Sequence, residues 1–151
     1  MLFLLFHLDN DCYALDAGQV VEILPLVSIR RMLRPPPGVI GTINYHGAFV
    51  PIVDLTEMTL GRQASPRLST RIILVRCSGE EGQPRILGLV AEKATDTMRR
   101  EPADFVSSGI TNDAAPYLGA IANGPRGLVQ RIELDKLLPA SVADLVPKQP
   151  A

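Results

Sequence analysis

The stretch from Gly41 to Leu55, with the sequence GTINYHGAFVPIVDL, limits what this chain can fold into more than any other segment. It predicts two short strands around a tight turn, in which Gly47 supplies the positive φ that a hairpin needs. Asn44, Tyr45 and His46 place polar and amphipathic groups at the tip, where His46 is expected to be exposed. Pro51 cannot donate a hydrogen bond to a ladder, so its strand is expected to be an edge strand or to be bulged there. Asp54 follows and can cap a short helix. The segment holds no nucleophile beside a base, which favours a surface built for contact.

Short apolar runs separated by turn signals recur along the whole chain. About ten such runs can be counted, which indicates an all-β barrel or sandwich. No long amphipathic helix is present, so βαβ architectures are not favoured. At 151 residues and 46% hydrophobic residues, one globular domain is expected. We predict that it spans residues 1–139 and that 140–151, which contains two prolines, is a flexible tail.

The residues between the apolar runs also predict three connections. Gly61 to Ser69 is expected to be a solvated connector and the clearest internal break. Ser78 to Pro84 is predicted as a hairpin loop. A brief turn is expected between the strand Ile86–Ala91 and a further strand, Ala94–Arg99.

Two segments of the sequence share a pattern of glycine, isoleucine and aspartate residues. Gly41-x-Ile43 is followed by Gly47 and Asp54, and Gly119-x-Ile121 is followed by Gly127 and Asp135. Both segments are predicted as hairpins that lead into a short helix. Chance would explain so short a match, and so would two similar small barrels in one chain.

Charge and composition exclude several classes of partner. A net charge of −1 with 5% aromatic residues favours neither nucleic acid nor an anionic membrane surface. The apolar start, Leu2 to Leu8, is too short to span a bilayer and lacks the basic region and cleavage site of a signal peptide. Cys12 and Cys77 lie in apolar runs and are interpreted as free thiols. A cytoplasmic protein without membrane insertion is therefore expected.

The sequence offers no pattern of catalytic or ligand-binding residues. It lacks a phosphate-binding loop, a nucleophile elbow and any Cys or His pair at metal-ligand spacing. A triad drawn from His46, Asp54 and a serine would be possible in almost any chain of this length. We therefore expect no enzyme activity, no catalytic residue, no cofactor and no metal. Glu22, within Val-Val-Glu-Ile-Leu, either faces solvent or meets a basic or polar group near the hairpin tip.

Several segments together resemble the CheW family of chemotaxis coupling proteins. They are Phe3–Phe6 with Tyr13–Asp16, Val20–Ile23, the block Gly41-Thr42-Ile43-Asn44-Tyr45-His46-Gly47, and Val50–Leu55. The resemblance continues more loosely through Leu87–Val90 and the final hairpin to Leu138, and covers about residues 2 to 139.

The resemblance implies a fold and a function. The fold would be two intertwined five-stranded SH3-like barrels with short helices. The function would be that of a non-enzymatic adaptor in a membrane-attached array. One barrel would bind the regulatory domain of a CheA-type histidine kinase, and the groove between the barrels would hold the cytoplasmic tip of a methyl-accepting chemoreceptor. Position by position, Val20 and Glu22 match family residues near the receptor groove, and Gly41 and Asn44 match the hairpin motif.

His46 departs from the family pattern. The resemblance implies an arginine there, facing the acid that matches Glu22. Arginine is always charged and offers a fork of donors, whereas histidine is mostly neutral at pH 7. The alternative prediction is therefore a CheW-like module of a specialised pathway, such as surface sensing, biofilm formation or twitching, or a competitor of the main coupling protein.

Overall fold

The computed structural model describes residues 1–35, 39–78, 84–110 and 115–137. This part of the chain forms ten strands: β1 (Leu2–Leu8), β2 (Asp11–Asp16), β3 (Val20–Pro25), β4 (Arg30–Arg31), β5 (Val39–Tyr45), β6 (Ala48–Asp54), β7 (Arg71–Ser78), β8 (Pro84–Arg99), β9 (Leu118–Gly124) and β10 (Gly127–Ile132). Its helical segments are α1 (Leu55–Leu60) and the short turns η1 (Ala17–Gln19), η3 (Pro102–Asp104) and η4 (Leu134–Lys136). None of these helices is long and apolar enough to cross a membrane.

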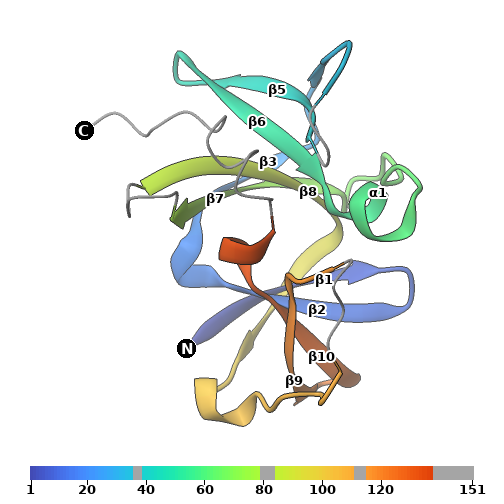
Figure 1. Ribbon diagram of the computed structural model, residues 1–151, viewed down its shortest axis with the longest axis vertical. Helices are drawn as coiled ribbons and strands as arrows, with labels where there is room; N and C mark the ends of the chain where they lie inside the picture. The colour runs from blue at the N-terminus through green and yellow to red at the C-terminus, as the bar shows by residue number, and fades with distance from the viewer. Residues whose placement is uncertain (36–38, 79–83, 111–114, 138–151) are drawn as a thin grey trace.

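The strands form two SH3-like barrels stacked on one another (Figure 1). In the first barrel, β3, β7, the first half of β8, β6 and β5 pair in that order, and β4 extends β5. In the second barrel, the second half of β8 pairs with β1, followed by β2, β10 and β9. The all-β fold of two five-stranded barrels is therefore confirmed.

Strand β8 belongs to both barrels. The sequence predicted two strands here, one ending at Ala91 and one beginning at Ala94, with a turn between them. The structure instead has one strand of 16 residues, which passes from one barrel to the other. The predicted turn is replaced by a bend at Lys93, whose φ is 52°. One residue in the left-handed region redirects a strand without ending it.

The β5–β6 hairpin forms as the sequence predicted, and Asp54 caps α1. Its carboxylate accepts hydrogen bonds from the backbone N–H groups of Thr56 (2.9 Å) and Glu57 (3.2 Å). The sequence predicted an edge strand or a bulge at Pro51. The edge strand is wrong, because β6 lies between β5 and β8, and the irregularity in the β5–β6 ladder lies between Val39 and Gly41 of β5 instead. Pro51 pairs with Thr42 of β5, and the pairing with β8 begins one residue later, at Ile52. The proline thus stands where β6 has a single paired neighbour.

The repeated sequence pattern corresponds to a repeated arrangement of strands and a short helix. In the first barrel, β6 runs parallel to β8 and leads into α1; in the second, β10 runs parallel to β2 and leads into η4. Each barrel thus contains a hairpin whose second strand makes a parallel pairing and ends in a short helix.

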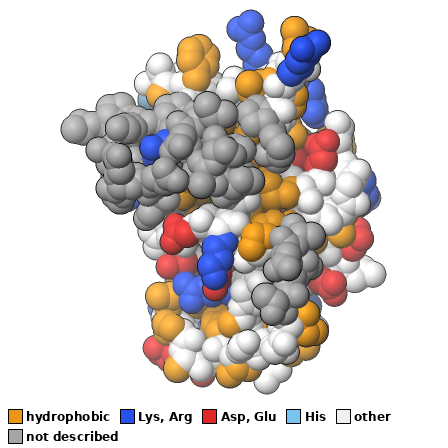
Figure 2. All heavy atoms as spheres, viewed as in Figure 1, with side chains coloured by type: hydrophobic (Ala, Val, Ile, Leu, Met, Phe, Trp, Pro, Cys, Tyr) orange, Lys and Arg blue, Asp and Glu red, His pale blue; other side chains and the backbone are white. Residues whose placement is uncertain are grey.

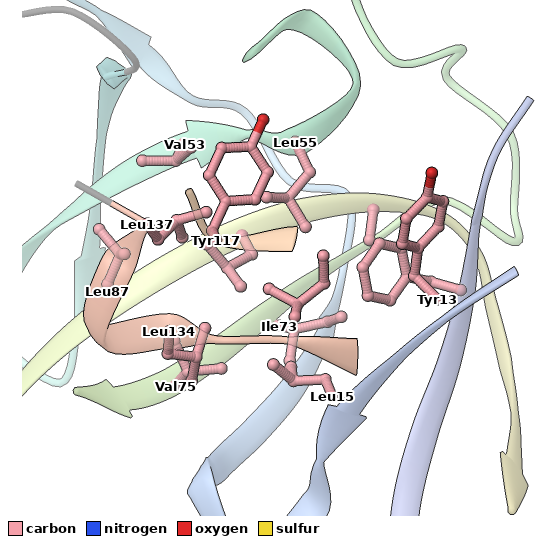
Figure 3. Close-up of a cluster of buried hydrophobic side chains, with 14 of the residues drawn as sticks. Tyr13, Leu15, Val53, Leu55, Ile73, Val75, Leu87, Tyr117, Leu134 and Leu137 are labelled. Carbon is pink, nitrogen blue, oxygen red and sulfur yellow. The ribbon is translucent and has the colours of Figure 1, made fainter. Parts of the chain in front are cut away.

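One buried cluster crosses from barrel to barrel. It joins Tyr13 and Leu15 of β2 to Ile73 and Val75 of β7, and Leu134 of η4 packs against the same group (Figure 3). Two smaller clusters fill the individual barrels, one around Ile52 and one around Phe3. Since the largest cluster draws on both barrels, the barrels fold around common apolar surface rather than as separate units.

The connector between α1 and β7 is held in place. The sequence predicted a solvated break from Gly61 to Ser69. In the structure, the guanidinium of Arg62 donates to Asp9 (2.7 Å) in the β1–β2 turn and to Glu92 (3.1 Å) in β8. The backbone N–H of Ser65 donates to the other oxygen of Glu92 (3.1 Å). The connector therefore links the two barrels instead of separating them.

Other predictions concern the cysteines and the chain end. Cys12 and Cys77 are free, as expected, and both are half-buried. The boundary predicted at residue 139 and the tail 140–151 lie outside the described residues, as does most of the loop predicted from Ser78 to Pro84.

We expect Glu92→Gln to lower the free energy of unfolding at neutral pH by about 1 kcal/mol, because the amide loses charge-assisted hydrogen bonds. Burial acts to raise the pKa of Glu92, but the hydrogen bonds from Ser65 and Arg62 outweigh burial and lower the pKa. A lowered native pKa gives stability that is present above the unfolded value, about 4.3, and is lost as pH falls through the native value. Urea unfolding should therefore show the wild type and the variant converging in acid. An equal difference at neutral and acid pH would contradict this account.

Candidate partner-docking site

The tip of the β5–β6 hairpin is a two-residue turn made of His46 and Gly47. Tyr45 and Ala48 pair on either side of it. The φ values are 50° at His46 and 85° at Gly47, and positive φ at both central residues is the pattern of a type I′ turn. The side-chain oxygen of Asn44 accepts a hydrogen bond from the N–H of Gly47 (2.9 Å), which fixes the turn. His46 is exposed, as the sequence predicted.

A row of three side chains connects β3 to this tip. The hydroxyl of Tyr45 donates a hydrogen bond to the carboxylate of Glu22 on β3. The Tyr45 ring meets the His46 ring edge-on, with 4.3 Å between ring centroids and 70° between planes. Glu22, Tyr45 and His46 therefore form one continuous, solvent-facing group.

The sequence left two alternatives for Glu22, a position facing solvent or contact with a polar group at the hairpin tip, and both are correct in part. The residue is exposed, and it also meets a polar group at the hairpin tip. That group is Tyr45, which the sequence places at the tip but which is not among the residues predicted for the site. The available signal was a phenol within the Asn44–Gly47 block. The contact of this phenol with Glu22 could not be predicted, because β3 and β5 lie about twenty residues apart in the sequence and do not pair.

Gly41 and Val20 have other surroundings. A Cβ atom on Gly41 would lie 2.3 Å from the carbonyl oxygen of Arg30, so glycine is required there for β4 to approach β5. Val20 packs against the large core cluster, and the register of β3 against β7 shifts between Val20 and Glu22. The structure therefore brings Glu22 to Asn44–His46, and it places Gly41 and Val20 in supporting positions.

Exposed apolar side chains and arginines surround the hairpin. Phe49, opposite Asn44 in the register, is 62% exposed, and Leu33 is fully exposed. Arg30, Arg31 and Arg34 lie nearby in the sequence, and residues 23–53 contain no Asp or Glu. Figure 2 shows hydrophobic and basic side chains together at the end of the molecule where β5 and β6 lie. This end is apolar and positively charged in a chain whose net charge is −1.

Comparisons with known proteins agree with this architecture. The model of the CheW-like domain family matches residues 2–142. The chain is 27% identical over 149 residues to the chemotaxis protein CheW of Klebsiella aerogenes, covering 95% of this chain and 85% of that protein. The crystal structure of the scaffolding protein TtCheW from Thermoanaerobacter tengcongensis has a similar fold, with a TM-score of 0.74 and 24% identity. That similarity covers 89% of this chain and 84% of the other.

We expect Tyr45 to titrate above the ordinary tyrosine value of about 10. The hydrogen bond to Glu22 raises the pKa of Tyr45, and burial and the charge of Glu22 act in the same direction. Any stability from this bond is complete below the unfolded value and is lost as pH rises through the raised native value. NMR titration of labelled tyrosine rings should show Glu22→Gln returning Tyr45 toward its ordinary value.

Tyr13 serves as the internal control for that titration. Burial and the charges of Asp11 and Tyr117 raise its pKa, so Glu22→Gln should leave it unchanged. A shift of both tyrosines, or of neither, would count against the Glu22–Tyr45 bond.

Proposed function

The chain belongs to the CheW-like domain family, and on that premise we propose that it is a non-enzymatic adaptor that couples a chemoreceptor to a CheA-type histidine kinase. The observation that carries this proposal is the family match, which spans both barrels rather than one. A coupling adaptor must bind two different proteins at once, and two joined barrels provide two surfaces in a fixed relation. The site of action would be a membrane-attached receptor array.

The hairpin tip has the chemistry of a docking surface. Glu22, Asn44 and His46 are exposed, and the Asn44–Gly47 and Glu22–Tyr45 hydrogen bonds order them before a partner arrives. Ordering a contact surface in advance reduces the conformational entropy that is lost on binding. We propose that Val20, Glu22, Gly41, Asn44 and His46 define the receptor-binding region, with Tyr45 and Phe49 added to the set.

The arginines near this end suggest the character of one partner. Arg30, Arg31 and Arg34 outnumber the carboxylate of Glu22 at this end, so the apolar surface carries positive charge and complements an acidic, partly apolar face. Rim charges of this kind mainly accelerate association and select partners. We therefore expect binding at this end to weaken as salt rises.

His46 supports a second candidate function within the same family. A histidine in place of the arginine that the family resemblance implies would weaken the ordinary receptor contact, because histidine lacks the fork of donors of a guanidinium. The protein would then serve a specialised array, or it would compete with the main coupling protein for the kinase.

Reconstitution with receptor-containing vesicles and the cognate CheA-type kinase tests the coupling proposal. A coupler should raise kinase activity only when receptor is present, because it joins the two. Phe49→Ala should reduce this activation, since truncation removes an exposed apolar contact of the kind that dominates interfaces. The matched control is Leu68→Ala, because Leu68 is 99% exposed on the connector, outside the hairpin.

Other outcomes of that assay separate the alternatives. A folded protein that lowers the activity of arrays already containing a standard coupling protein is a competitor. If the protein neither alters kinase activity nor binds the kinase regulatory domain, the adaptor proposal fails.

We expect His46→Arg to increase affinity for the receptor tip of a standard chemotaxis system several-fold. The guanidinium would supply a permanent charge next to Tyr45, whose hydroxyl donates to the carboxylate of Glu22. Thermal stability should change little, because position 46 is exposed. Binding can be measured by fluorescence anisotropy with a labelled receptor fragment, with His46→Gln as the neutral control. Equal affinities of the Arg and Gln variants would show that this position does not determine receptor preference.

A further inference from the structure

A cavity of about 340 Å³ lies at the junction of the two barrels. It is bordered by the β1–β2 turn, the connector after α1 and the crossing point of β8. In Figure 1 the β1–β2 turn and α1 lie on the same side of the molecule. The docking residues described above do not line this cavity.

The cations around the cavity outnumber the carboxylates. Arg62, Arg67 and Lys93 line it, together with Asp9 and Glu92. Both carboxylates bind the same partner, because Arg62 lies 2.7 Å from Asp9 and 3.1 Å from Glu92. Within the described part of the chain, Arg67 and Lys93 form no ion pair. Two exposed cations are therefore available at the rim.

Further hydrogen-bond donors border the cavity. The hydroxyl of Ser69 and the amide of Asn10 line it, and so does Ser65, whose hydroxyl already bonds to Glu92. His7 borders it too, and its Nδ1 is buried without a hydrogen-bond partner among the described residues. A buried polar atom without a partner is costly, and a bound ligand is one common reason for it.

The backbone conformation at Lys93 also supports a ligand site here. Its φ of 52° lies in the left-handed region, where glycine is free of strain and lysine is not. Such residues persist only where the surrounding structure holds them, here at the bend of β8, and they cluster at ligand-binding sites. Here the strained residue contributes one of the two unpaired cations.

We propose that this cavity binds a phosphate group, either free or as the ester of a small molecule. A phosphate dianion matches the two unpaired cations, and its oxygens can accept hydrogen bonds from arginine, lysine and hydroxyl donors. The cavity is large enough for phosphate with a small organic substituent. A bound phosphate would bridge the connector and β8. The inference does not depend on the adaptor function.

The test is binding of inorganic phosphate and of glucose 6-phosphate, measured by isothermal titration calorimetry at low ionic strength. Binding to the native state should also raise the thermal midpoint. Arg67→Gln and Lys93→Gly should each weaken binding by about tenfold or more, as expected for loss of one charge-assisted contact. Arg76→Gln is the matched control, since Arg76 is exposed on β7 and does not line the cavity.

Lys93→Gly separates a binding role from a structural one. Glycine relieves the strained φ, so the thermal midpoint without phosphate should be unchanged or higher while binding is lost. Tighter binding of glucose 6-phosphate identifies an ester as the ligand, and equal binding identifies the phosphate group alone. The proposal is overturned if the wild type responds to chloride of equal ionic strength as it does to phosphate, or if Arg76→Gln weakens binding as much as Arg67→Gln.

Discussion

Strand β8 forms backbone hydrogen bonds with strands of both barrels. Its first half pairs with β7 and β6, and its second half pairs with β1. Side chains pack closely against it: a Cβ atom on Gly88 would lie 2.3 Å from Cδ1 of Ile52, so the glycine leaves room for that buried side chain. The bend at Lys93 then sets the direction in which the second barrel continues. Neither barrel can complete its sheet without the other.

This dependence explains how a small chain can act as an adaptor. The large apolar cluster spans both barrels, and Arg62 ties the connector of the first to the β1–β2 turn of the second. Surfaces on such a body keep their relative positions when a partner binds. The hairpin tip at one end and the cationic cavity at the junction are therefore held by the same framework. A ligand at the junction would act on the contacts that fix the angle between the barrels.

Most of the local structure could be predicted from the residues themselves. Gly47 at the turn, Asp54 as the cap of α1 and the short helix after the last hairpin form as expected. The failures involve distant partners. The connector was predicted as solvated because its sequence is polar, but Arg62 and Ser65 bind a carboxylate thirty and twenty-seven residues away. In the candidate site, the sequence indicated the exposed tip and a polar partner for Glu22, and only the structure identifies Tyr45.

The all-β class, the hairpins and the caps could be predicted from the residues, because these features depend on steric preferences and hydrogen bonds within a few residues. The family could be predicted from the resemblance of the motifs. Only the folded chain shows that β8 continues through Lys93, that β6 is an interior strand despite Pro51, and that Glu22 meets Tyr45. It also gathered Arg62, Arg67 and Lys93 around one cavity. Those arrangements depend on which strands lie side by side and on buried apolar contacts between distant segments, and no local pattern encodes them.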